Sequence, residues 1–151
     1  MKIVLNKCFG GFELSHEAKM EIFKKRGIEV FPYIINWRGD GNFYEKYEGL
    51  AIERFHNSLT ASIVYFKEDP KVDSFIEKIF EKTEYDPIYL EFDYENREDG
   101  DLVEVVEKLG KLASGRFSEL KVVEIPDGAS YKINDYDGFE TAYYGFQLGS
   151  V

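Results

Sequence analysis

The chain has little of what catalytic and metal-binding sites usually depend on. Its 151 residues include one cysteine, Cys8, and only two histidines. A single cysteine excludes an internal disulfide and fits a reducing compartment. Two histidines are too few for a histidine-rich metal site, so zinc would need carboxylates or ligands from another chain. We therefore expect no cofactor and no bound metal.

Positive charge is also scarce, and long apolar runs are missing. Lys and Arg number 19 against 29 Asp and Glu, which gives a net charge of −10. Such a surface repels nucleic acids and anionic lipid, so we expect no direct nucleic-acid binding; a basic partner would suit it better. No stretch approaches the roughly 18 apolar residues of a membrane helix, and the first residues do not resemble a signal peptide. We predict a cytoplasmic protein without membrane association.

Apolar and aromatic residues, in contrast, are plentiful. Hydrophobic residues make up 44% of the chain, with 13 Phe and 11 Tyr. This content is enough for a core, and no linker divides the sequence, so residues 1–151 are predicted to form a single domain. Several aromatic residues gather near the C-terminus, where they either close the core or form a surface for a homo-oligomer. These are Phe139, Tyr143, Tyr144 and Phe146.

The spacing of apolar residues predicts an α+β (mixed α/β) fold, with three helices packed on a mixed, partly antiparallel sheet that ends in C-terminal hairpins. The helices are expected after three N-cap signals, at 16–26 after Ser15, at 70–80 after Asp69-Pro70, and from Asp101 to a stop at Gly115. The strands are expected at 3–5, 30–37, 61–66, 88–94, 120–125, 131–133 and 139–146. Residues 43–57 fit neither period.

A glycine-rich loop between the first strand and the first helix is the strongest candidate for a binding site. Paired glycines permit positive φ angles and close approach of a backbone, and the free amides of a following helix can hold an anion. The predicted ligand is small and anionic or nucleotide-like, and its site comprises Lys7, Cys8, Gly10, Gly11, Ser15 and His16. The loop matches neither a P-loop nor a dinucleotide fingerprint, so a simple turn is the alternative interpretation.

An enzyme is the remaining alternative. Cys8 would act as the nucleophile with His16 as its base, because a thiol near a helix N-terminus has a lowered pKa. A lone cysteine beside a strand is more often a small buried residue, so we assign no catalytic residue and favour a protein without enzymatic activity. Carboxylates also alternate at positions 91, 93 and 95, as on the solvent face of a strand.

Four segments of the chain resemble a family of small proteins encoded by bacteriophages and prophages. The similar segments are residues 2–12 with Leu14-Ser15, 102–110, 120–128 and 135–140. The likeness extends over about 1–28 and 88–142, whereas a middle segment at about 30–87 diverges. The resemblance implies a phage accessory protein that acts inside a bacterial host. It implies no chemistry, because the family has no established activity.

Three functional hypotheses follow. The first is a non-enzymatic phage accessory protein that binds a host cytoplasmic partner, with interference in a host defence system as its concrete form. The second is a binder of a small anionic or nucleotide-like ligand at Gly10-Gly11. The third is a small enzyme that uses Cys8 and His16.

Overall fold

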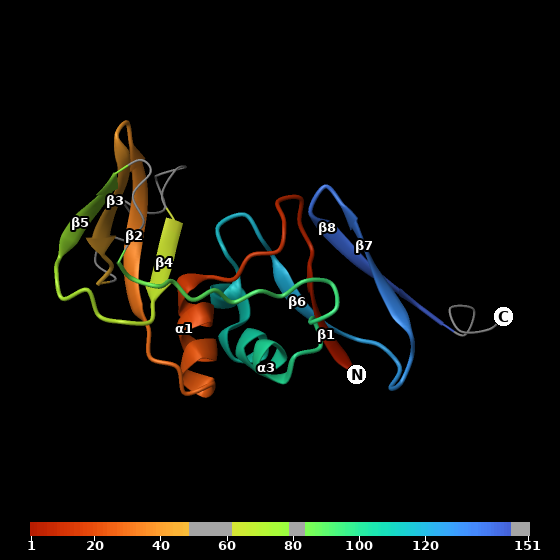
Figure 1. Ribbon diagram of the computed structural model, residues 1–151. Helices are drawn as coiled ribbons and strands as arrows, with labels where there is room; N and C mark the ends of the chain where they lie inside the picture. Colours follow the sequence, from red (N-terminus) through yellow and green to blue (C-terminus); the bar gives the residue numbers. More distant parts are fainter. Residues whose placement is uncertain (49–61, 79–83, 146–151) are drawn as a thin grey trace. The chain divides into compact units, whose positions relative to one another are not determined.

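The computed structural model describes residues 1–48, 62–78 and 84–145 (Figure 1). The chain divides into two compact units. The terminal unit contains residues 1–27 and 91–151, and the inserted unit contains residues 28–90. The bounds of the inserted unit lie close to those of the segment that diverges from the phage resemblance. That residues 1–151 form a single domain stays a prediction.

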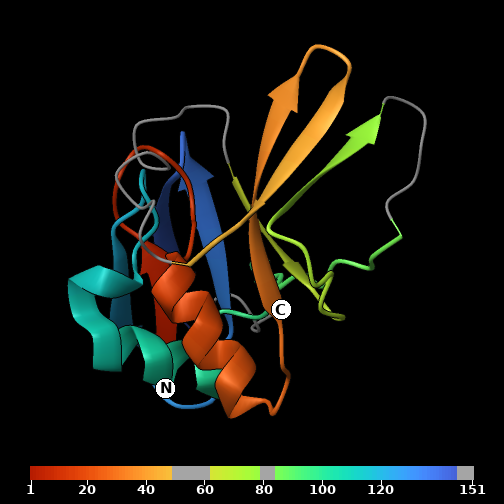
Figure 2. The same ribbon diagram turned by 90° about the vertical axis from the view of Figure 1, so that its left-hand side faces the viewer.

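The terminal unit has three layers. Its elements are β1 (Lys2–Asn6), α1 (His16–Lys25), α3 (Gly100–Leu109), the 3₁₀ turn η1 (Gly110–Ala113), β6 (Leu120–Glu124), β7 (Tyr131–Tyr136) and β8 (Phe139–Tyr144). Strand β1 pairs with β6 and β7 pairs with β8, both antiparallel. The two helices lie side by side on one side of the β1–β6 ribbon, and the β7–β8 hairpin lies on the other (Figures 1 and 2).

Strand β1 is the centre of this unit, because it is buried on both faces. Ile3 and Leu5 are at most 1% exposed and pack with Ile125 and with apolar residues of the hairpin. Val4 points to the opposite face and is fully buried as well. A strand covered on both faces carries a continuous apolar run, which explains why its sequence does not alternate.

Local capping decides where the two helices begin. The Ser15 hydroxyl accepts a hydrogen bond from the amide of Ala18 at 3.1 Å, so the predicted cap of α1 is confirmed. The predicted cap of α3 is wrong by two residues, because Asp99 and not Asp101 accepts from the Leu102 amide. Helix α3 also ends before the predicted Gly115, since Gly110 takes a φ of 58° at its C-cap.

The inserted unit is one antiparallel sheet with an aromatic core. Its strands are β2 (Phe31–Arg38), β3 (Gly41–Lys46), β4 (Ser62–Phe66) and β5 (Ser74–Lys78), in the order β4-β2-β3-β5. Tyr33, Tyr44 and Phe66 are buried together. Tyr44 lies opposite Phe75 across β3 and β5, and their rings stack at 4.5 Å. Burial also raises the pKa of Tyr44 to about 12.

The overall α+β class is confirmed, but the prediction of three helices is wrong. The described residues contain two α-helices, α1 and α3. Where the third helix was expected, residues Ser74–Lys78 form β5. The Asp69 side chain accepts a hydrogen bond from the Lys71 amide, so it closes a turn instead of capping a helix. The Phe75 ring packs into the aromatic core, which shows tertiary packing overriding a local helix signal.

Two further expectations fail. Residues 88–94 do not form a strand. The Ile88 amide donates to the carbonyl of Tyr65 in β4, and the chain then continues without regular structure to α3. The sheet is also not mixed, because every strand pair in the described part of the chain is antiparallel. Parts of the predictions that fall on residues 49–61, 79–83 and Phe146 lie outside the described residues.

Candidate functional site

The predicted glycine loop lies where three segments of the terminal unit meet. A Cβ atom added to Gly10 would lie 2.0 Å from the carbonyl oxygen of Phe117. A Cβ atom on Gly138, in the β7–β8 turn, would lie 2.4 Å from the amide nitrogen of Gly11. Only glycine permits such close backbone contacts. We call this region, residues 8–12, 115–119 and 135–139, the three-loop tip.

The tip takes up several of the residues predicted to bind a ligand. The Lys7 ammonium, at its base, donates to the carbonyl of Glu140 at 2.6 Å and lies 5.1 Å from the ring centroid of Phe139. Gly11 has a φ of 101°, which explains the glycine at this position. The structure thus brings Lys7, Cys8, Gly10 and Gly11 together. Residues from the 115–119 loop and from the β7–β8 hairpin contact them. Ligand binding at these residues stays a prediction.

The Cys8 thiol is engaged by two oxygen atoms. It donates to the carbonyl of Phe117 at 3.2 Å and to the side-chain oxygen of Asn6 at 3.5 Å. Neither a peptide carbonyl nor a carboxamide oxygen can remove a proton from a thiol at neutral pH. The two groups bonded to the thiol therefore do not serve as its base.

The remaining two predicted residues begin helix α1. Besides capping Ala18, the Ser15 hydroxyl donates to the carbonyl of Leu112 at 2.5 Å, and the Ser15 amide donates to Ala113. Ser15 therefore ties α1 to η1. Burial lowers the pKa of His16, so its imidazole favours the neutral form in the folded protein. The contacts of Ser15 give it a structural role at the helix start, and His16 is the first residue of α1.

An ion pair that the sequence analysis did not identify lies beneath the tip. Arg97 and Glu140 are 3% and 1% exposed. The guanidinium forms a bidentate pair with the carboxylate, with Nη1–Oε1 at 2.5 Å and Nη2–Oε2 at 2.8 Å. Such paired geometry gives the strongest charge-assisted hydrogen bonds. The two residues are separated by 43 positions, and each stands in a charge-rich segment, so no local pattern connects them.

The ion pair completes the free edge of β1. The Asn6 amide donates to Oε1 of Glu140 at 2.8 Å, and the Val4 amide donates to the carbonyl of Arg97 at 2.9 Å. The Phe12 ring covers the guanidinium, with its centroid 3.8 Å from Cζ. Within the described part of the chain, no buried side-chain nitrogen or oxygen lacks a hydrogen-bond partner. A buried polar network in which every group is hydrogen-bonded makes the surrounding structure rigid.

The Asn6 side chain connects strand β1 to the tip through hydrogen bonds. Its amide nitrogen donates to the carbonyls of Cys8 and Gly138, at 2.9 and 2.7 Å. Its oxygen accepts from the Glu119 amide at 2.8 Å. One fully buried residue therefore binds all three loops.

The outer surface of the tip is aromatic. Phe9, Phe117 and Tyr136 are 68%, 55% and 73% exposed. The Phe9 ring meets Tyr136 edge-on at 6.3 Å and Phe139 at 5.5 Å. Large aromatic side chains exposed together on rigid loops are typical of protein-binding surfaces.

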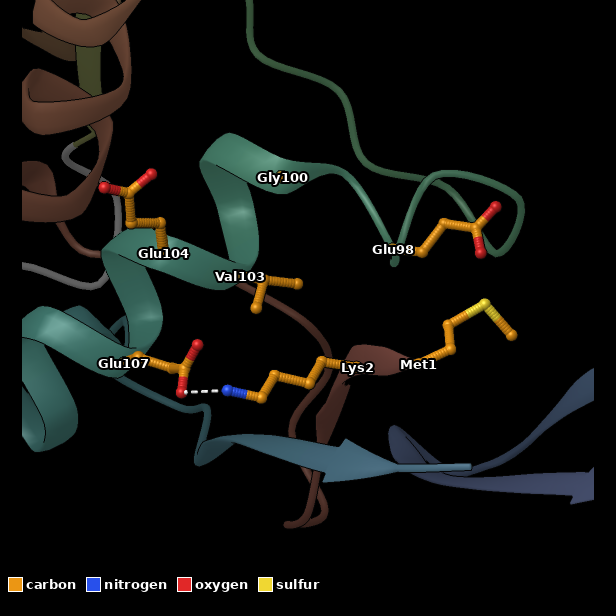
Figure 3. A pocket seen from close by; sticks show the side chains of 7 residues that line it. All are labelled: Met1, Lys2, Glu98, Gly100, Val103, Glu104 and Glu107. Carbon is orange, nitrogen blue, oxygen red and sulfur yellow. Dashed lines mark hydrogen bonds and ion pairs between the residues drawn. The ribbon is translucent and has the colours of Figure 1, made fainter. Parts of the chain in front are cut away.

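A separate pocket of about 440 Å³ lies between α3 and the start of β1 (Figure 3). It is lined by Met1, Lys2, Glu98, Gly100, Val103, Glu104 and Glu107. The Lys2 ammonium spans it to bind Glu107 at 2.9 Å, and Glu104 pairs with Lys25 at 2.9 Å. Two of the three carboxylates that line it, Glu104 and Glu107, are thus paired with lysines.

In the described ranges, no group of three or more His, Cys, Asp or Glu residues is placed to hold a metal ion. Within the same ranges, neither length nor apolar content allows any helix to cross a membrane.

Comparison with known proteins finds no match among protein-family models, curated proteins or solved structures. The phage resemblance therefore stays a prediction.

Substitution of Gly10 tests the packing of the tip. Gly10→Ala should lower the free energy of unfolding by about 1–3 kcal/mol, because its Cβ meets the backbone of Phe117 and forces the loops apart. Gly100→Ala is the control, since a Cβ there meets nothing within 4 Å. Urea unfolding measures both. Equal stability of the two variants would contradict the close packing described for the tip.

Removal of one charge tests the buried pair. Glu140→Gln should destabilise the protein by about 3–5 kcal/mol, because it leaves the Arg97 guanidinium buried without its counter-ion. Glu107→Gln removes the exposed pair with Lys2 and should cost less than about 1 kcal/mol. Chemical denaturation of both variants gives the comparison. A similar small loss for both would mean that the Arg97–Glu140 pair is not buried in solution.

Proposed function

We propose that this protein is a non-enzymatic binding protein that recognises a protein partner through the three-loop tip. The observation that carries the proposal is the exposure of Phe9, Phe117 and Tyr136 on three loops that are locked to one another. Aromatic side chains contribute much of the binding energy at protein interfaces, and here no apolar neighbour covers most of their area.

The rigidity of the tip supports this proposal. Binding is costly when loops must first be ordered, and a surface already held in shape avoids that cost. The contacts of Gly10 and Gly138 bring the loop backbones together, and the Asn6 side chain bonds to all three. The exposed rings are therefore presented by a scaffold fixed from below.

The contacts at the tip favour this function over the two alternatives. The Cys8 thiol is bonded to oxygen atoms that cannot act as its base, which gives the enzyme no support. Two side chains expected to hold a small anion are also engaged, since Lys7 binds the Glu140 carbonyl and Ser15 caps its own helix. A macromolecular partner needs neither group to be released.

The phage resemblance indicates where the partner would be found. If the chain is a phage accessory protein, the partner is a protein of the bacterial cytoplasm, and interference with a host defence system is the concrete form of the function. This part of the proposal rests on the resemblance and not on the geometry of the tip.

Paired aromatic substitutions test the proposal. Phe9→Ala combined with Tyr136→Ala should weaken binding of the host partner at least about tenfold, because both rings are exposed and their loss removes contact area without disturbing the core. The measurement is quantitative co-purification from host lysate, followed by titration of the retained partner and by plaque counts on a host that carries the defence.

Tyr89→Ala provides the matched control, since Tyr89 is 70% exposed in the inserted unit. It should leave both partner binding and plaque counts unchanged. The proposal fails if the tip variant and the control retain the same partner with equal affinity, or if neither the wild type nor the variants affect phage growth or retain a partner.

A further inference from the structure

Positive side chains lie over aromatic rings throughout the terminal unit. The pairs are Arg97 with Phe12 at 3.8 Å, Lys7 with Phe139 at 5.1 Å, Arg116 with Phe117 at 5.1 Å, Arg97 with Tyr94 at 5.5 Å and Arg26 with Phe92 at 5.6 Å. A cation over a ring face is attracted by the quadrupole of the ring, and arginine adds stacking of its planar guanidinium. The chain thus covers ring after ring with its own cations.

Two rings at the tip are left uncovered. Phe9 and Tyr136 are 68% and 73% exposed, so most of the surface of each side chain is open to solvent. Their ring planes meet at 79°, and Phe9 also lies 5.5 Å from the ring of Phe139, yet both side chains keep a large exposed area beside these contacts. A positive group from a partner can therefore lie over these exposed rings, as the chain's own cations lie over neighbouring rings.

A carboxylate is placed beside the open rings. Asp137 follows Tyr136 directly, at the turn of the hairpin, where it is exposed and has a φ of 52°. It makes no ion pair with any described residue. Asp135, on the other side of Tyr136, already accepts hydrogen bonds from the Gly138 amide and the Tyr94 hydroxyl. Asp137 is therefore the carboxylate that a partner can use.

The charge of the whole chain selects among occupants of this surface. A net charge of −10 attracts basic partners over a distance and repels a second copy of the chain, a nucleic acid or an acidic peptide. A group that both stacks on aromatic faces and pairs with a carboxylate is a guanidinium, which does so better than an ammonium because it is planar and binds in a two-pronged manner.

From these observations we infer that the partner surface bound by the tip presents arginine side chains, which pack on the faces of Phe9 and Tyr136 and pair with Asp137. The inference rests on the proposed function and specifies the chemistry of its partner.

Short peptides of equal charge test the inference. The full-length ¹⁵N-labelled protein is titrated with a capped peptide of alternating glycine and arginine that has three arginines, and with its lysine and glutamate counterparts. NMR follows the amide signals of Gly10, Gly11 and Gly138. The arginine peptide should shift these signals saturably and bind at least about twofold tighter than the lysine peptide, which controls for charge alone. The glutamate peptide should produce no shift.

Variants of the tip complete the test. Asp137→Asn and Phe9→Ala should each weaken the arginine peptide about two- to fivefold, as expected for one exposed ion pair or one exposed cation–ring contact. Tyr89→Ala should not change its affinity. Equal binding of the arginine and lysine peptides, shifts confined to α3 and its pocket, or concentration-dependent signal broadening from a dimer through the tip would each overturn the inference.

The inference and the proposed function can fail separately. If the Phe9 and Tyr136 variant loses the host partner while Asp137→Asn retains it with full affinity, the tip binds a protein but not through arginine. If the arginine peptide binds at the tip and its affinity falls in Asp137→Asn, the inference holds even where the host partner remains to be identified.

Discussion

The buried ion pair of Arg97 and Glu140 is the interaction on which the terminal unit depends. Two charges removed from water are costly unless each is paired and fully hydrogen-bonded, and here both conditions are met. The pair joins the segment before α3 to strand β8, and its polar atoms complete the free edge of β1 through Val4 and Asn6. Because a buried charge without its partner is costly, the pair favours arrangements that keep the segment before α3 and strand β8 together.

That arrangement extends outward to the surface. Asn6 lies between the ion pair and the three-loop tip, where its side chain bonds to each of the loops. Glycines at positions 10 and 138 then let the loop backbones touch. The consequence is an exposed aromatic surface supported by a rigid interior, which is the arrangement that specific binding favours. The proposed function, binding of a protein partner, rests on this arrangement of the tip.

Much of the fold follows from local signals in the sequence, and the failures have a physical pattern. The apolar run of β1 and the Ser15 cap each depend on neighbouring residues, and each is confirmed. The helix expected at 70–80 fails because Phe75 packs with rings from distant strands. Long-range packing decided that segment, and a single sequence carries no signal of it.

The same distinction applies to the site. The glycine pair marks a close approach of backbones, but the chain itself makes that approach, through Phe117 and Gly138. The partnership of Arg97 with Glu140 spans 43 positions and has no signature in spacing.

The most direct test of the account is hydrogen exchange at the amides of Asn6 and Glu119. The Asn6 amide bonds to Glu140, and the Glu119 amide bonds to the Asn6 side chain. The account predicts exchange as slow as in the core of β1 at both amides; exchange as fast as in exposed loops would contradict it.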